Sequence, residues 1–131
     1  NPMTNALKIE TFPYYFAIAK IRNPASINWK SPFVFVGKTD DELSLVALES
    51  EVPSDAYPVD RGYRMMRVAG TLDMSLTGIL ARISKVLADE EIPIFAVSTY
   101  NTDYILVKSH TFRNAIQALS RAGYLVSNEI S

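Results

Sequence analysis

Proline is distributed very unevenly along this chain of 131 residues. Six of its seven prolines precede residue 60, and only Pro93 follows. Proline breaks the interior of a helix and cannot donate a hydrogen bond within a sheet. The distribution therefore predicts two unequal parts, a strand-rich part at residues 1–60 and a part at residues 61–131 in which helices can form.

The first part contains three apolar runs that predict strands, at residues 14–21, 33–37 and 43–48. The run at 14–21 is apolar on both faces, as expected of a strand that is buried on both sides. The polar connection at 38–42 is short, which predicts an antiparallel hairpin between the second and third strands. Residues 49–61 carry two prolines and four acidic residues, and we interpret them as a linker.

The second part alternates between strand and helix patterns. Apolar residues recur at helical spacing over residues 76–87 and again over 112–119. Strands are predicted at 63–69, 94–99, 104–108 and 124–127, with a turn at 100–103. The resulting order is β-α-β-β-α-β, which predicts an α+β, ferredoxin-like fold with both helices on one face of an antiparallel sheet.

The ends of the two helices carry recognisable signals. Asp73 or Ser75 is placed to cap the first helix, and Ser109 or Thr111 to cap the second. Gly123 is placed where a left-handed residue usually ends a helix. Gly78 falls in the predicted first turn, where glycine costs about 1 kcal/mol relative to alanine. Two explanations remain open, a ligand close to the backbone or tight packing of the helix on the sheet.

The composition excludes several classes of function. The chain has 13 Lys and Arg against 14 Asp and Glu, one His and no Cys. This balance argues against a nucleic-acid partner, because phosphate neutralisation requires an excess of basic residues. Without Cys there are no disulfides, zinc fingers or thiol nucleophiles. No nucleophile–base set is evident, so we expect no catalytic residues, no metal and no cofactor, and hence no enzyme.

No run approaches the roughly 18 apolar residues of a membrane span, and the first residues lack the pattern of a signal peptide. We therefore expect a cytoplasmic protein with no membrane partner. His110, before the second predicted helix, is interpreted as an exposed or capping residue. The acidic residues at 40–42 are interpreted as the solvated tip of a hairpin.

Two segments have the chemistry to bind a zwitterion. The start of the first helix offers free N–H groups and the positive end of a dipole, which suit a carboxylate. The segment 98–103 (STYNTD) lies at the turn between two strands, which can be adjacent to that helix start. Asp103 could then bind an ammonium group. The pair predicts a site for an α-amino acid.

The run Ser75–Val107, with TGIL followed by IFAVSTYNTDYILV, resembles the ACT-domain family of amino-acid-sensing modules. Together with Ser31–Pro53 it is most similar to small bacterial tandem-ACT proteins related to the cytosolic arginine sensors. The resemblance implies two side-by-side ACT-like units, at 1–60 and 61–131, with ligands at interfaces between units. It also implies a regulatory, non-catalytic homodimer.

The resemblance further implies the residues of the ligand site. The ligand carboxylate would lie at the backbone of Leu76, Thr77, Gly78 and Ile79. The polar and cationic groups of the ligand would meet Thr99, Tyr100 and Asp103. The arginine sensors have an acidic residue where this chain has Leu76, so arginine itself is not implied. The alternative function is a protein–protein association domain with no small ligand.

Overall fold

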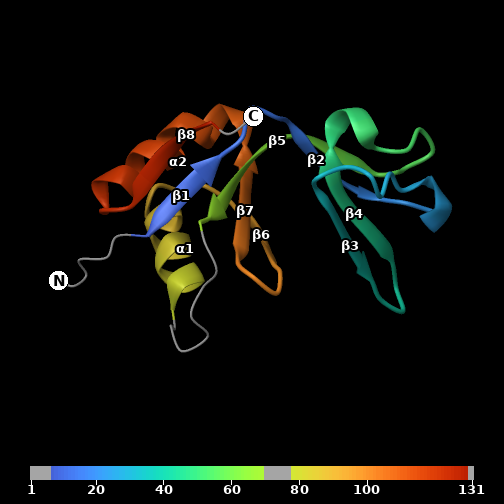
Figure 1. Ribbon diagram of the computed structural model, residues 1–131, viewed down its shortest axis with the longest axis horizontal. Helices are drawn as coiled ribbons and strands as arrows, with labels where there is room; N and C mark the ends of the chain where they lie inside the picture. Colours follow the sequence, from blue (N-terminus) through green and yellow to red (C-terminus); the bar gives the residue numbers. More distant parts are fainter. Residues whose placement is uncertain (1–6, 70–77, 130–131) are drawn as a thin grey trace. The chain divides into compact units, whose positions relative to one another are not determined.

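The computed structural model describes residues 7–69 and 78–129 of the chain (Figure 1). The chain divides into two compact units, one formed by residues 14–63 and the other by residues 1–13 together with 64–131. We call the first the inserted unit and the second the βαββαβ unit. The division into two ACT-like units at 1–60 and 61–131 stays a prediction, because compactness alone does not identify a unit as ACT-like.

The inserted unit is made of antiparallel strands. They are β2 (Phe16–Lys20), β3 (Val34–Lys38), β4 (Leu43–Leu48) and the first residues of β5 (Val59–Val68), with short 3-10 turns η2 (Pro24–Ser26) and η3 (Glu49–Glu51). They pair in the order β3-β4-β2-β5. The three predicted strands are confirmed. The prediction of a linker over residues 49–61 was wrong at its C-terminal end. Val59 already pairs with Ala19 of β2, and Asp60 with Ile18.

The predicted hairpin at 38–42 is confirmed. Lys38 of β3 is opposite Leu43 of β4 in an antiparallel register. The Thr39 N–H donates to the Glu42 carbonyl at 2.9 Å. The Thr39 hydroxyl accepts bonds from the amides of Asp41 at 3.1 Å and Glu42 at 3.3 Å. The polar residues of this segment therefore serve the turn itself.

The βαββαβ unit has the predicted order of elements. They are the later residues of β5, α1 (Ile79–Asp89), β6 (Phe95–Ser98), β7 (Asp103–Lys108), α2 (Ser109–Arg121) and β8 (Leu125–Glu129). Strand β1 (Lys8–Thr11), which lies between β5 and β8, is not among the predicted strands. It runs antiparallel to β5 and parallel to β8. The prediction of purely antiparallel sheets was therefore wrong for the β1–β8 pair.

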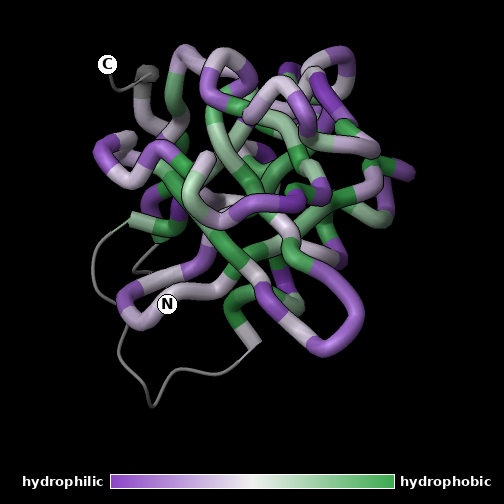
Figure 2. Tube along the Cα trace, turned by 90° about the vertical axis from the view of Figure 1, so that its right-hand side faces the viewer, coloured by the Kyte–Doolittle hydropathy of each residue, from purple (hydrophilic) through white to green (hydrophobic). Residues whose placement is uncertain are grey.

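Both helices cover the same face of this sheet, as predicted. Side chains alternate between the two faces along a strand, so Met66 and Val68 of β5 share one face. They belong to one apolar cluster with Ile83 of α1 and Leu119 of α2. Along the trace, several of the peripheral turns are hydrophilic (Figure 2). Burial of the apolar stripe of each helix therefore holds α1 and α2 on the sheet.

The predicted caps Asp73 and Ser75 lie outside the described residues, and neither Ser109 nor Thr111 is the cap of α2. In the described part of the chain, α1 begins at Ile79, and its cap is Gly78 with a φ of 75°. Helix α2 has Lys108 at its cap position, without a side-chain bond to the helix. Thr111 instead donates its hydroxyl hydrogen to the Lys108 carbonyl at 2.8 Å. Gly123 is left-handed after α2, with a φ of 102°, as predicted.

Candidate functional site

The turn between β6 and β7 holds Thr99 and Tyr100 of the predicted site and is followed by Asp103, and its own hydrogen bonds define it. The Thr99 N–H donates to the Thr102 carbonyl at 2.9 Å. The Thr99 hydroxyl donates to the same carbonyl at 3.0 Å and accepts from the Thr102 N–H at 3.4 Å. The hydroxyl of Thr99 is therefore engaged inside the turn, and Tyr100 lies at the tip with 96% of its surface exposed.

Asp103 is the first residue of β7, opposite Ser98 of β6 in the register. The Ser98 hydroxyl donates to Oδ1 of Asp103 at 2.6 Å, a short bond to a charged acceptor. This bond orients the carboxylate at the end of the hairpin. The arrangement presents a fixed negative charge that could bind a cation or an ammonium group.

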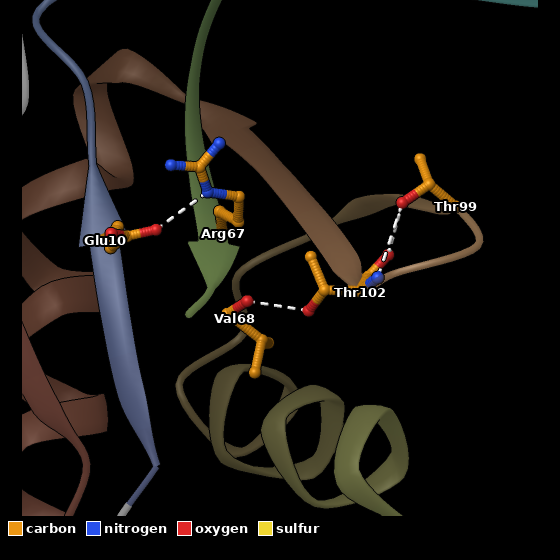
Figure 3. A network of polar contacts seen from close by, with 5 residues as sticks. All are labelled: Glu10, Arg67, Val68, Thr99 and Thr102. Carbon is orange, nitrogen blue, oxygen red and sulfur yellow. Dashed lines mark hydrogen bonds and ion pairs between the residues drawn. The ribbon is translucent and has the colours of Figure 1, made fainter. Parts of the chain in front are cut away.

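The second threonine of this turn, Thr102, connects the turn to a distant strand. Thr102 is 5% exposed, and its hydroxyl donates to the Val68 carbonyl at 2.6 Å (Figure 3). Val68 is the last residue of β5. The turn that carries Thr99, Tyr100 and Asp103 therefore lies beside the end of β5.

The start of α1 holds two more of the predicted site residues, Gly78 and Ile79. Gly78 has a left-handed backbone, and a Cβ built on it would lie 3.1 Å from Nη1 of Arg82. Ile79 is 6% exposed and belongs to the same apolar cluster as Val68, so only its backbone could meet a ligand. Leu76 and Thr77, also predicted for the site, lie outside the described residues. The ligand roles of all seven residues stay predictions.

A charged cluster that the sequence analysis missed lies between β1 and β5. Nε of Arg67 donates to Oε1 of Glu10 at 2.7 Å, and the two side chains are 28% and 22% exposed. The guanidinium carbon lies 4.8 Å from the ring centroid of Phe12 and 6.0 Å from that of Tyr104. No signal in the sequence pointed to this pair, because β1 itself was not predicted.

The electrostatics of this cluster favour the charged arginine. Partial burial acts to lower the pKa of the Arg67 guanidinium, because burial disfavours the charged form. Hydrogen bonds to Glu10 and Tyr104 and the charge of Glu10 outweigh burial, so the pKa is raised above its ordinary value. Arg67 and Glu10 therefore form an ion pair across the two strands.

Within residues 7–69 and 78–129, no group of three or more His, Asp or Glu side chains is arranged to hold a metal ion. Over the same residues, no helix is long and apolar enough to cross a membrane. His110 lies exposed in the first turn of α2.

Residues 59–121, which run from the start of β5 to the end of α2, match the family model of the ACT domain. Over 96% of both chains, the protein is 30% identical to protein Atu0741 from Agobacterium tumefaciens, with a TM-score of 0.86. Residues 59–121 of this chain therefore form an ACT domain. No curated protein sequence matches the chain.

Two more distant structures share the fold of this ACT-domain protein. Protein VC0802 from Vibrio cholerae, described as a possible transport protein, is 15% identical with a TM-score of 0.70, over 88% of this chain and 89% of that one. The regulatory subunit of aspartate kinase from Thermus thermophilus, in a ligand-free form, is 11% identical with a TM-score of 0.61. That match covers 88% of this chain and 96% of the subunit. At these identities the likeness concerns the fold alone.

Proposed function

We propose that this ACT-domain protein is a non-catalytic regulatory module that binds an α-amino acid. ACT domains generally bind amino acids in regulatory roles, and a regulatory subunit is among the proteins that share this fold. The observation that carries the proposal is the hydrogen bond from Thr102 to the Val68 carbonyl. It holds the turn with the Asp103 carboxylate beside the end of β5, the strand that precedes the connection to α1.

The proposed ligand is bound at both of its charged groups. Asp103 binds the ammonium group, and its carboxylate is already oriented by the Ser98 hydroxyl. The ligand carboxylate binds the N–H groups at the start of α1, where the helix dipole is positive. The residues proposed for these contacts are Leu76, Thr77, Gly78, Ile79, Thr99, Tyr100 and Asp103.

The finer proposals concern the subtype and the assembly. The protein is a cytoplasmic tandem of two side-by-side ACT-like units, of the type related to the arginine sensors. It acts as a homodimer in which ligand and assembly are linked, because a ligand held at an interface favours the assembled state. Leu76 stands where the arginine sensors have an acidic residue, so the ligand is an amino acid with a less basic side chain.

The test is a thermal-shift panel of the twenty amino acids, followed by titration calorimetry with any that raises the melting temperature. Binding to the folded state alone stabilises it by about 2.7 kcal/mol at a ligand concentration of 100 Kd. Asp103→Ala should weaken binding at least tenfold, because a hydrogen bond to a charged group contributes roughly 1.5–3 kcal/mol.

The matched control is Asp89→Ala, which removes an exposed carboxylate of the same unit that pairs with Lys85 at 3.1 Å on α1. This variant should bind like the wild type. Folded wild-type protein that binds no amino acid at millimolar concentration contradicts the proposal and favours the association domain without a small ligand.

A further inference from the structure

We infer that Thr102 is the positioning residue of the proposed site. Its side chain fixes the β6–β7 turn to the end of β5, and this sets the place of Thr99, Tyr100 and Asp103 relative to the strand. The consequence for ligand affinity rests on the function proposed above, whereas the positional role can be measured without a ligand.

The direction of the Val68 carbonyl follows from the pairing of β5. Val68 is opposite Ile9 of β1, and the next bond in this ladder runs from the Ala69 N–H to the Lys8 carbonyl at 2.8 Å. In an antiparallel pair, residues that exchange hydrogen bonds alternate with residues that do not. The N–H and C=O of Val68 therefore point away from β1, toward β7 on the other side of β5.

Strand β7 begins at Asp103. The Val68 carbonyl, at the end of β5, faces Thr102, the residue just before β7. The Thr102 hydroxyl fills this place and donates to the carbonyl at 2.6 Å, with Thr102 only 5% exposed. A buried carbonyl without a donor is unfavourable, so the hydroxyl completes the pairing in place of a backbone N–H.

The other hydrogen bonds of the turn do not provide this attachment. The bonds between Thr99 and Thr102 join residues three positions apart and close the turn on itself. The bond from Ser98 to Asp103 crosses only the hairpin. The bond from Thr102 to Val68 spans 34 positions and connects the hairpin tip to the strand that leads toward α1.

The same unit contains a matched control. Thr11 and Thr102 are the buried polar residues in the described part of the chain, at 4% and 5% exposed. The Thr11 hydroxyl donates to the Ser127 carbonyl at 3.5 Å, between β1 and β8. Valine at either position removes one buried hydroxyl without changing the size of the side chain. Of the two variants, only Thr102→Val removes a bond between the β6–β7 turn and β5.

The first measurement is amide hydrogen exchange by NMR on the full chain without ligand. The reporter is the Thr99 N–H, which donates to the Thr102 carbonyl. Thr102→Val should raise its exchange rate at least tenfold, whereas Thr11→Val should leave it within threefold of the wild type. Thr102→Ser keeps the hydroxyl and should restore the wild-type rate. If Thr102→Val does not fold, Thr102→Cys weakens the donor with less disruption.

The second measurement is titration with the amino acid that gives the largest thermal shift in the wild type. The Kd should rise at least tenfold in Thr102→Val and stay within threefold in Thr102→Ser and Thr11→Val. Equal effects of Thr102→Val and Thr11→Val on both readouts would overturn the inference. A wild type that binds no amino acid overturns the proposed function. In that case the exchange rates by themselves decide whether Thr102 positions the turn.

Discussion

At the scale of single residues, one backbone angle explains the glycine at position 78. The residue caps α1 with a φ of 75°, a left-handed conformation that costs L-residues roughly 1–2 kcal/mol. The atom nearest to an added Cβ is Nη1 of Arg82, at the far end of a flexible side chain. The conformation of the backbone, rather than a lack of space, therefore requires glycine here. The two explanations drawn from the sequence, a ligand close to the backbone or tight packing of the helix, did not anticipate a left-handed backbone at Gly78.

We predict that Gly78→Ala lowers the free energy of unfolding by about 1–2 kcal/mol, because alanine must adopt the left-handed conformation. Urea denaturation measures the loss. Gly37→Ala is the control, since nothing lies within 4 Å of an added Cβ and its φ is not positive. It should change the stability by less than about 0.5 kcal/mol. Similar losses in the two variants would contradict the explanation.

At the scale of elements, the register of β1 is specified by charge as well as by burial. Glu10 and Arg67 are directly opposite each other in the β1–β5 pair, and their side chains form the 2.7 Å ion pair. Ile9, the neighbouring residue of β1, is fully buried in the apolar cluster under the helices. A slip by one residue would expose Ile9 and separate the charges, so both features favour the same register.

We predict that a double-mutant cycle between Glu10→Gln and Arg67→Met gives a coupling free energy of about 1 kcal/mol. The pair is mostly buried and its carboxylate accepts a short, charge-assisted bond. The exposed pair Lys85–Asp89 on α1, with side chains 76% and 62% exposed, serves as the control. Its coupling should be about 0.3–0.5 kcal/mol and should fall in high salt. A weaker coupling at Glu10–Arg67 than at this control would refute the role of the pair.

At the scale of the whole molecule, the two ends of the chain belong to one unit. Strand β1 lies between β5 and β8, and residues 14–63 are inserted between the two parts of the βαββαβ unit. The β6–β7 turn is therefore linked through β5 to β1, the first strand, and β1 in turn pairs with β8, the last.

We predict that the protein sediments as a homodimer of two 14.6 kDa chains at micromolar concentration. The bound amino acid should strengthen dimerisation about 5–150-fold, the range of a coupling free energy of 1–3 kcal/mol. Analytical ultracentrifugation with and without the ligand measures both quantities. The ligand-deficient variant Asp103→Ala should dimerise like the unliganded wild type. A monomer at every concentration would rule out this assembly.

The sequence by itself determined the elements and their order in the second half of the chain. Helical spacing of apolar residues identified α1 and α2, because burial of one face imposes that period. Alternating and β-branched runs identified β6, β7 and β8, and the composition of residues 100–103 identified the turn, although Asp103 already begins β7. These signals are local, so they can be read without knowledge of the partners.

Only the tertiary structure decided how the strands pair. Strand β1 has four residues and too little pattern to be recognised, and its place between β5 and β8 depends on contacts far along the chain. The role of Thr102 was hidden for the same reason, since its acceptor is the carbonyl of Val68, a backbone atom 34 positions away. Burial and hydrogen bonding between distant segments leave no periodic signal in the sequence, so the three-dimensional arrangement was needed to find them.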